Sequence, residues 1–368
     1  MEREKTNLLG LERAELEKFF ATLGEKPYRA QQILRWAYHQ GVTDFGEMTN
    51  LSRKLRDALS SIAEFHPPEI VKRYDSIDGT KKWIVRAENG NSVETVLIPD
   101  RGRNTLCISS QVGCVLDCRF CATGKQGFNG NLSRADIAGQ VFNVARHLES
   151  VGDGRGITNV VFMGMGEPLY NFESVMGVVD LLTDDLAFGI SKRRVTVSTA
   201  GVAPEICRMA DRTGAALAVS LHAATDDLRD DLVPLNKKYP IAVLLDACRY
   251  YLSKVGPRRS VTIEYALLAG VNDSILHAKT LAKVLRTIRC KINLIPFNPF
   301  PASGFERPDE NTVREFQTHL LNAGYATMVR TTRGEDIEAA CGQLVGEVQD
   351  RTRRKARYIA RVQAQEVA

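Results

Sequence analysis

The stretch that decides the fold is Gly113-Cys114-Val115-Leu116-Asp117-Cys118-Arg119-Phe120-Cys121, in which three cysteines lie close together and an aromatic residue precedes the last one. Three closely spaced thiolates can hold three irons of a cubane cluster, whose fourth iron then needs a ligand from elsewhere. Catalytic metal centres keep such an open coordination position, whereas structural ones close it. The spacing therefore predicts a catalytic 4Fe–4S cluster held by Cys114, Cys118 and Cys121.

A zinc site is the alternative interpretation of these cysteines. Zinc ligands usually come as two separate pairs, and a fourth cysteine or histidine should follow nearby. The histidines form no such pair, and none lies close to the three cysteines in sequence. A cluster is therefore favoured, and a non-catalytic zinc-dependent RNA-binding protein stays open as the alternative from another functional class. The histidines are His39, His66, His147, His222, His277 and His319.

Composition and the N-terminus predict a cytoplasmic protein. Of 368 residues, 44% are hydrophobic and 25% are charged, as in ordinary soluble globular proteins. No apolar run approaches the roughly 18 residues that a membrane span needs. The charged start, Met1-Glu2-Arg3-Glu4-Lys5, has no apolar signal region after it. Without export, the eight cysteines are expected to be reduced thiols and metal ligands.

Positive charge is concentrated at the C-terminus. The chain has a formal net charge of +5, and the segment 351–368 accounts for all of it. A basic tail on a neutral body suits contact with RNA phosphates, although a solvated terminal helix is equally consistent with the charge alone. Short basic clusters within the body, at 192–194, 237–238 and 258–259, favour nucleic acid as the partner.

The first 65 residues are expected to form a helical domain. Leu16, Phe19, Phe20 and Leu23 recur at helical spacing before Gly24, a plausible end signal. Leucines repeat in the same way over 51–62, with Asn50 as the expected N-cap. Two alternating segments, Lys82–Ala87 and Ser92–Pro99, then predict a β-hairpin. The expected organisation is a helical accessory domain (1–65), a linker with the hairpin (66–100), a catalytic core (101–345) and a basic tail (346–368).

From about residue 104 onwards, strands alternate with amphipathic helices. This rhythm predicts a parallel sheet with right-handed crossovers, either flat or rolled into a barrel. One of the helices opens at Ser133, with Asp136 completing a capping box. The expected strands are Leu106–Ser110, Thr158–Met163, Val195–Thr199, Leu217–Leu221, Val261–Tyr265 and Lys291–Ile295, with a late strand at Tyr325–Arg330.

Unusual residues follow these strands at their carboxyl ends, where parallel β/α folds collect their chemistry. Glycines allow close approach of a ligand to the backbone, and Glu167 offers an acceptor for an ammonium group. None of the other residues would be notable alone, and their shared location is the evidence. The residues are Gly164–Pro168, Ser198, Ser220, Leu221, His222 and Asn298.

The combined motifs resemble the radical S-adenosylmethionine (SAM) RNA adenine-C2 methyltransferases of the RlmN/Cfr family, which are dual-specificity enzymes. The resemblance runs over nearly the whole chain, apart from the segment beyond about 350. It implies an α/β fold with a partial (β/α)6 radical-SAM barrel, an N-terminal helical domain and a bridging β-hairpin. The motifs are 105–114, the cluster loop, 127–129, Gly164–Pro168, Val261–Tyr265, Cys290–Pro301 and Arg330–Leu344.

The resemblance also assigns roles to individual residues. Cys114, Cys118 and Cys121 match the ligands of one 4Fe–4S cluster. Cys341 matches a cysteine that is methylated during turnover, Cys107 its transient disulfide partner, and Glu94 the proton acceptor. SAM contacts are expected from Gly166, Glu167, Ser198, Ser220, Leu221, His222 and Asn298.

Chemistry explains why two cysteines beyond the cluster are needed. Adenine C2 is electron-poor and does not attack the electrophilic methyl of SAM, whereas a cysteine thiolate does. A radical formed from a second SAM can then activate the methylated cysteine for addition to C2, and a second thiol releases the resulting crosslink. Of the five cysteines outside the cluster loop, Cys207, Cys248 and Cys290 lie on apolar faces and are expected in the core.

The function implied by the resemblance is methylation of C2 of an adenine in 23S rRNA and of the adenine 3′ to the anticodon in some tRNAs. Methylation at C8 of the same rRNA adenine uses the same apparatus and stays open, as does whether Glu94 or Cys107 takes the C2 proton. The expected partners are these RNAs and an electron donor such as flavodoxin with its reductase, and we expect a monomer that does not bind membranes.

Overall fold

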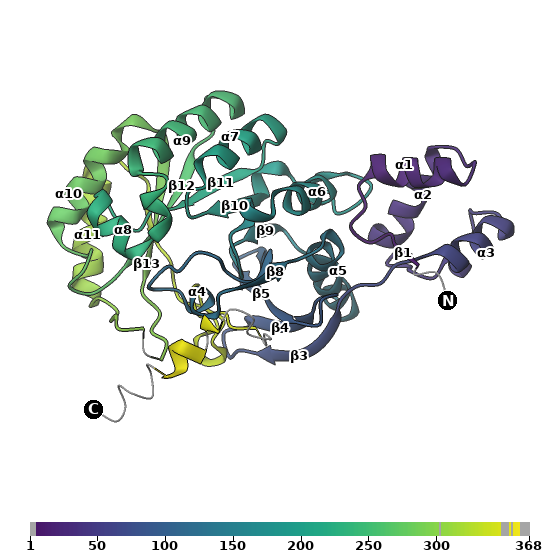
Figure 1. Cartoon of the computed structure of the whole chain (residues 1–368), viewed down its shortest axis with the longest axis horizontal. Coiled ribbons are helices and arrows are strands. Elements are labelled where there is room, and N and C mark those ends of the chain that lie inside the picture. The colour runs from purple at the N-terminus through teal and green to yellow at the C-terminus, as the bar shows by residue number, and fades with distance from the viewer. Residues whose placement is uncertain (1–4, 302, 347–352, 355, 361–368) are drawn as a thin grey trace.

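The computed structural model describes residues 5–301, 303–346, 353–354 and 356–360 (Figure 1). Its centre is a ten-stranded sheet with the strand order β14-β13-β12-β11-β10-β9-β6-β5-β4-β3. Two small sheets, β1 with β2 and β7 with β8, accompany it. The strands are β1 Thr6–Asn7, β2 Ala63–Glu64, β3 Glu69–Asp75, β4 Lys81–Arg86, β5 Ser92–Asp100, β6 Arg103–Cys107, β7 Gln111–Gly113, β8 Phe128–Asn131, β9 Asn159–Phe162, β10 Val195–Thr199, β11 Ala216–Ser220, β12 Val261–Leu267, β13 Cys290–Pro296 and β14 Thr327–Val329.

From β6 and β9 to β14 the paired strands run parallel, which confirms the expected α/β class. Helices α6, α7 and α9 to α11 follow one another along the outside of this sheet (Figure 1). The α-helices are α1 Arg13–Thr22, α2 Tyr28–Leu34, α3 Arg53–Ile62, α4 Ala122–Gln126, α5 Arg134–Ser150, α6 Phe172–Thr183, α7 Ala203–Arg212, α8 Asp226–Leu232, α9 Ile241–Val255, α10 Ile275–Val284 and α11 Glu310–Asn322.

Alternation along the strands divides the side chains between two environments. On β12, Tyr265 points outwards and packs on Phe316 of α11, with 5.4 Å between the ring centroids. The neighbouring Glu264 lies opposite Asn293 in the parallel pairing and lines a cavity inside the sheet. Residues of β5, β6, β9, β10, β12 and β13 line this one cavity, so the sheet is rolled into a partial barrel rather than flat.

The N-terminal helices form at the expected places, but one cap is different. Ser52, not Asn50, is the N-cap of α3, because its side chain accepts a hydrogen bond from Leu55 N (3.2 Å). The Asn50 side chain instead accepts a hydrogen bond from Trp36 Nε1 (2.7 Å). The two residues are close in sequence and both are good caps, so composition alone did not separate them.

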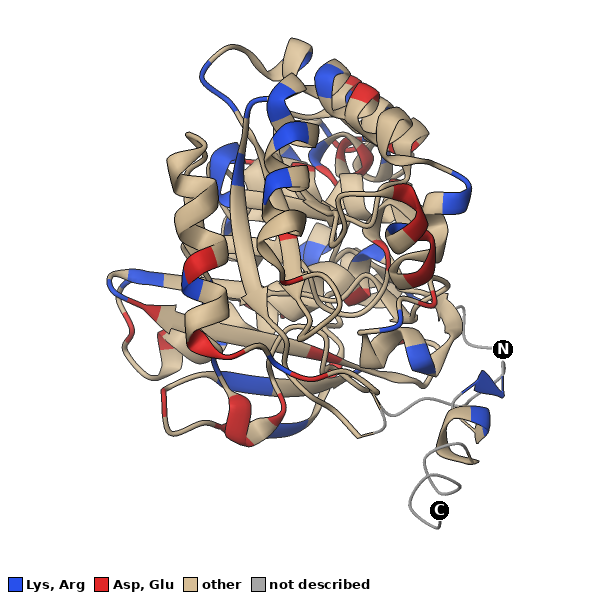
Figure 2. Cartoon of the chain, turned by 90° about the vertical axis from the view of Figure 1, so that its left-hand side faces the viewer, with Lys and Arg blue, Asp and Glu red and all other residues tan. Residues whose placement is uncertain are grey.

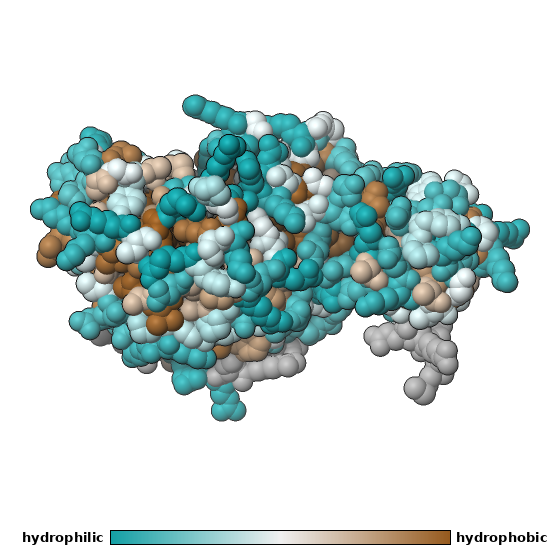
Figure 3. Space-filling model, turned by 90° about the horizontal axis from the view of Figure 1, so that it is seen from above, coloured by the Kyte–Doolittle hydropathy of each residue, from teal (hydrophilic) through white to brown (hydrophobic). Residues whose placement is uncertain are grey.

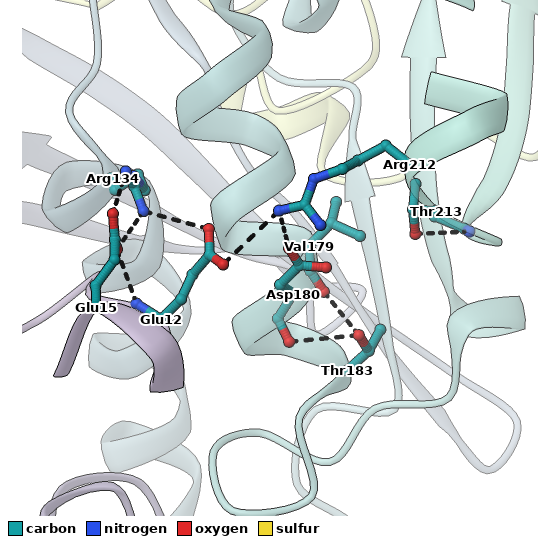
Figure 4. A network of polar contacts seen from close by, with 9 residues as sticks. Glu12, Glu15, Arg134, Val179, Asp180, Thr183, Arg212 and Thr213 are labelled. Atoms are coloured by element: carbon teal, nitrogen blue, oxygen red, sulfur yellow. Dashed lines mark hydrogen bonds and ion pairs between the residues drawn. The ribbon is translucent and has the colours of Figure 1, made fainter. Parts of the chain in front are cut away.

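Ion pairs hold α1 against the barrel helices (Figure 4). Both terminal guanidinium nitrogens of Arg134 on α5 bind Glu15, at 2.5 and 2.8 Å. Glu12 lies 3.3 Å from Arg134 and 3.7 Å from Arg212 of α7. Below these charges, buried Tyr38 packs on Phe142 and Phe188 of the barrel layer. The helical segment is therefore fixed to the barrel by both polar and apolar contacts.

The expected hairpin is present as β4 and β5, and a third strand, β3, extends it. The sequence did not predict β3, because its side chains are mostly exposed on both faces and give no clean alternation of apolar and polar residues. These antiparallel strands continue the sheet from β6, so Glu94 on β5 and Cys107 on β6 belong to one surface.

Most of the expected basic tail, including Arg351 and Arg361, lies outside the described residues. Elsewhere the charges of both signs are interspersed (Figure 2). Seen from above, apolar side chains gather on the barrel, whereas the N-terminal helices present mostly hydrophilic ones (Figure 3). Within the described ranges, the helices lack the combination of length and apolar character that crossing a membrane requires.

Candidate active site

A cavity of about 150 Å³ lies at the carboxyl ends of the barrel strands. Cys114, Cys118 and Cys121 all line it, together with Cys341 from the distant C-terminal segment. Most of the residues expected to contact SAM also line it, namely Gly166, Glu167, Ser198, Ser220, His222 and Asn298. Segments far apart in the sequence therefore meet in one hollow.

The cluster loop is shaped by a glycine. Gly113 ends β7 with φ of 69°, and a Cβ there would lie 1.8 Å from Gly127 O, so no other residue fits. Burial first, and then the neighbouring thiols, raise the pKa of Cys114 and of Cys118. Cations that bind thiolates would reverse these shifts, so the donor set suits a cationic metal centre.

The three cysteines do not form a single-ion site. In the part of the chain that the structure describes, no group of three or more cysteine, histidine or carboxylate side chains converges to hold one metal ion. A cubane cluster needs no such convergence, because each thiolate binds a different iron.

Glu167 is held firmly by backbone groups. Its Oε1 accepts a hydrogen bond from Leu169 N (3.1 Å) and its Oε2 accepts one from Ala200 N (2.7 Å). Burial nevertheless raises the pKa of Glu167 to about 7. The preceding Gly166 has φ of 98°, and a Cβ there would meet Gln111 at 2.4 Å. A carboxylate fixed this way can accept further donors, such as the ammonium group of a ligand.

His222 has a left-handed backbone (φ of 60°) that turns its ring towards the cluster loop. The ring packs on Phe120 at 4.5 Å between centroids, and Nδ1 accepts a hydrogen bond from Ala266 N (2.9 Å). Burial, reinforced by Arg229, lowers the pKa of His222 to about 3. The ring is therefore neutral, and Nε2 carries its proton.

Leu221 differs from the other expected SAM contacts. Its side chain is fully buried in the hydrophobic core and is not among the residues that line the cavity. Its backbone N donates to Glu264 O and its carbonyl accepts from Arg229. Successive side chains in an extended chain point to opposite faces. Ser220 and His222 face the cavity, so Leu221 between them faces the core on the other side.

Asn298 and Cys341 are joined directly. Asn298 Nδ2 donates to Cys341 O (3.3 Å), and Asn298 Oδ1 accepts from Thr332 (3.0 Å). The segment that carries Cys341 is also tied to α4, because Gly342 O accepts from Ala122 N (2.8 Å) and Leu344 O accepts from Thr123 Oγ1 (2.7 Å). Cys341 is thus placed by the same helix that begins just after Cys121.

Cys107 and Glu94 lie beneath this segment. Cys107 is close enough to Cys341 for the two thiols to interact, and burial followed by this interaction raises the pKa of Cys107 to about 12. Glu94 is 3% exposed, and its Oε1 lies 3.5 Å from Lys82 Nζ. Burial outweighs Lys82 and raises the pKa of Glu94 to about 7.

Arg229 is an important residue that sequence reasoning missed. It is fully buried and donates to carbonyls at the ends of β10 and β11, namely those of Ala200, Ser220 and Leu221. A fourth bond reaches Asn236 Oδ1 (2.9 Å). The available signal was a lone basic residue in the acidic run 226–231. Arg229 holds the strand ends that form the cavity wall.

Replacing Arg229 tests how much its hydrogen bonds stabilise the fold. Arg229→Met keeps the length but leaves several buried carbonyls without a donor, so we expect the free energy of unfolding to fall by about 3–5 kcal/mol. Arg119→Met is the control, because Arg119 pairs with Asp231 at a half-exposed site and should cost only about 0–1 kcal/mol. Urea denaturation of both variants measures the difference, and equal losses would contradict the assignment.

Known proteins match both parts of the chain. Residues 6–65 match the ribosomal RNA large subunit methyltransferase N-terminal domain, and residues 108–281 match the radical SAM superfamily. The class that fold and site define is therefore that of the radical SAM enzymes. Membership of this class implies a 4Fe–4S cluster and SAM as cofactors.

Full-length relatives narrow the class to one family. The dual-specificity RNA methyltransferase RlmN of Marinobacter nauticus is 60% identical over 97% of both chains. That of Pseudomonas fluorescens is 56% identical over 97% of this chain and 94% of its own. A crystal structure of a radical SAM methyltransferase from Sphaerobacter thermophilus is 44% identical, covers 92% of this chain and 99% of its own, and has a TM-score of 0.86. The chain belongs to the RlmN family of radical SAM RNA methyltransferases.

Proposed function

We propose that this protein methylates C2 of an adenine in 23S rRNA and of the adenine 3′ to the anticodon in some tRNAs, with two SAM molecules consumed per turnover. The observation that carries the proposal is that Cys341 lines the same cavity as the three loop cysteines. In this proposal the nucleophilic thiol of Cys341 lies beside the position where radical chemistry starts. The names of the relatives support RNA as the substrate.

In this proposal, Cys114, Cys118 and Cys121 hold the cluster, and Gly166, Glu167 and the strand-end residues hold SAM. When bound, these cofactors supply the methyl group and, after reduction by a flavodoxin-type donor, the radical that removes hydrogen from the methylated cysteine. The neutral ring of His222 offers a donor at this place without adding charge. Asn298 acts through the carbonyl of Cys341 and keeps the thiol facing the cavity.

Cys341 first takes the methyl group as a thiolate, forming a sulfur–carbon bond as the sulfonium–methyl bond of SAM breaks. Burial raises the pKa of Cys341, and the nearby Arg330 opposes this shift, so the cation favours the reactive form. After carbon–carbon bond formation the adduct gives up the C2 proton, and one electron returns to the flavodoxin-type partner. The thiolate of Cys107 then attacks the sulfur of Cys341, and the disulfide forms as the bond from that sulfur to the methylene breaks. The electron pair of the broken bond stays with the carbon, which takes up a proton to become the methyl group, and the methylated adenine leaves.

Nucleoside analysis tests the proposal directly. The reconstituted enzyme is incubated with SAM, a reductant, and rRNA or tRNA, and the RNA is digested and separated by mass spectrometry. We expect 2-methyladenosine from both RNAs. The appearance of 8-methyladenosine would replace the proposal by the sister activity, and unmodified RNA would overturn it.

A pH profile separates the two candidates for the C2 proton. Because burial raises the pKa of Glu94 to about 7, its carboxylate form increases as the pH rises through 7. Decay of the enzyme–RNA crosslink in a single turnover should therefore accelerate about tenfold from pH 6 to pH 8 if Glu94 is the base. Cys107, with a pKa of about 12, would give no limb that levels off above pH 7, because its thiolate fraction keeps rising about tenfold per pH unit over this whole range.

Two substitutions complete this test. Glu94→Gln should remove the limb near pH 7 and slow the decay at every pH. Glu338→Gln is the matched control, because Glu338 is an exposed carboxylate close enough to interact with Glu94. A limb that survives in Glu94→Gln would exclude Glu94 as the proton acceptor.

A further inference from the structure

A second cavity, of about 450 Å³, occupies the barrel interior towards the amino ends of the strands. It is larger than the cavity at the cluster loop, and its volume lies in the range of pockets that hold small organic ligands. Glu264, Asn298, Arg330 and Cys341 line both cavities, so the two spaces meet at the thiol of Cys341. A group that enters here reaches the thiol from the side opposite the cluster loop.

The wall of this second cavity carries hydrogen-bonding atoms without partners. Glu264 is 3% exposed, and its Oε1 accepts from Asn293 Nδ2 (2.9 Å). Glu264 Oε2 and Asn293 Oδ1 are both buried and have no hydrogen-bond partner among the described residues. A buried acceptor without a donor costs about 1–3 kcal/mol, and donors on a ligand in this cavity would remove that cost.

Arg330 adds a donor beside these two acceptors. It follows β14, where its backbone N binds Leu294 O (2.8 Å), and its guanidinium interacts electrostatically with Glu264, Cys341 and Cys107. Two acceptors on neighbouring strands and a cationic donor near the thiols therefore face one space.

Adenine has the complementary pattern on its Watson–Crick edge. Its exocyclic amine donates two hydrogens, the adjacent N1 accepts one, and C2 follows directly after N1. Guanine presents a carbonyl and an N–H in these places, which would oppose both the acceptors and the cation. A base read in this way turns C2 towards the end of the cavity where Cys341 lies.

We propose that Glu264, together with Asn293, reads the exocyclic amine of the target adenine in this cavity, and that Arg330 faces its N1. The inference rests on the proposed function and extends it by naming the residues that select the base. The base must leave its stack to enter, as in other enzymes that act on a nucleobase. Thr262 lines the same cavity but is not one of the residues proposed to read the base. It lies opposite Lys291, nearer the amino end of β12.

An RNA with purine in place of the target adenine tests the assignment, because purine lacks only the exocyclic amine. We expect wild-type enzyme to prefer adenine by at least about tenfold in kcat/KM. Glu264→Ala should lose most of its activity on adenine RNA while changing the purine RNA little, so that the preference shrinks towards unity. Purine also differs from adenine in intrinsic reactivity, so the ratio of the two rates with wild-type enzyme is not sufficient. The test is the change in this ratio that Glu264→Ala causes.

Controls separate base reading from loss of structure. Glu264→Gln keeps the shape and one acceptor, so it should retain part of the preference. Thr262→Val should leave the ratio between the two RNAs unchanged. Methylation of Cys341 by labelled SAM without RNA, and iron content, should both persist in Glu264→Ala, since neither step involves the base.

Several results would overturn the inference. Equal losses on adenine and purine RNA in Glu264→Ala would show that the carboxylate does not read the amine. Equal rates of the two RNAs with wild-type enzyme, or loss of Cys341 labelling in Glu264→Ala, would do the same. If wild-type enzyme labels Cys341 but modifies neither RNA, the proposed function itself fails, and the inference fails with it.

Discussion

Cys341→Ala is expected to form no covalent adduct with RNA, whereas Cys107→Ala is expected to accumulate one. Removal of Cys341 takes away the methyl carrier, so no carbon can be transferred. Removal of Cys107 leaves the carrier and its surroundings intact but deletes the thiol that resolves the crosslink. The product should be Cys341 joined through a methylene to adenine C2.

Denaturing electrophoresis of each variant from cells, with and without nuclease, measures this difference. If both residues had a purely structural role, both variants would show the same defect, namely less folded protein and no adduct. Because Cys107 is 6% exposed and packs in the core, iron content serves as the check that the variant is folded. A folded, cluster-bearing Cys107→Ala without bound RNA would refute the division of labour between the two thiols.

The second large effect is expected for Cys118→Ala, which should retain little cluster and cleave no SAM. Two remaining thiolates do not hold a cubane stably, and three are the minimum that leaves one iron open. Anaerobic reconstitution followed by iron analysis and detection of 5′-deoxyadenosine gives the result. Cys248→Ala is the matched control, because this cysteine is fully buried on α9, away from the cavity lining, and should load iron normally.

Full iron loading and normal cleavage in Cys118→Ala would remove this residue from the ligand set. A comparable loss in Cys248→Ala would attribute the defect to folding instead. Both variants lose one thiol group, but only the thiol of Cys118 is expected to bind iron. A difference in iron content between the two variants therefore reports ligation and not the loss of a thiol as such.

Sequence patterns predicted the barrel because its signals are local. Strand β10 has the expected bounds, Val195–Thr199, since four of its five residues are Val or Thr, whose branched Cβ favours an extended chain. The capping box of Ser133 and Asp136 also forms as expected, with a 3.0 Å bond from Asp136 N to Ser133 Oγ. Both features depend on residues close in sequence.

Features that depend on contacts between distant segments were not predictable in this way. Strand β3 is stabilised by pairing with β4 rather than by its own pattern, and it contains a register shift between Ile70 and Lys72. Arg229 and Arg330 are charged residues that the fold buries or half-buries, and charge patterns assign such residues to the surface.

The hydrogen bonds between α4 and the segment that bears Cys341 have a consequence for maturation of the enzyme. Gly342 O, Leu344 O and Gly346 O all accept hydrogen bonds from residues of α4, the helix that starts directly after the last cysteine of the cluster loop. A change in the position of the cluster loop is therefore passed through α4 to the segment that carries Cys341. Loading of the cluster and placement of this thiol are accordingly expected to be coupled.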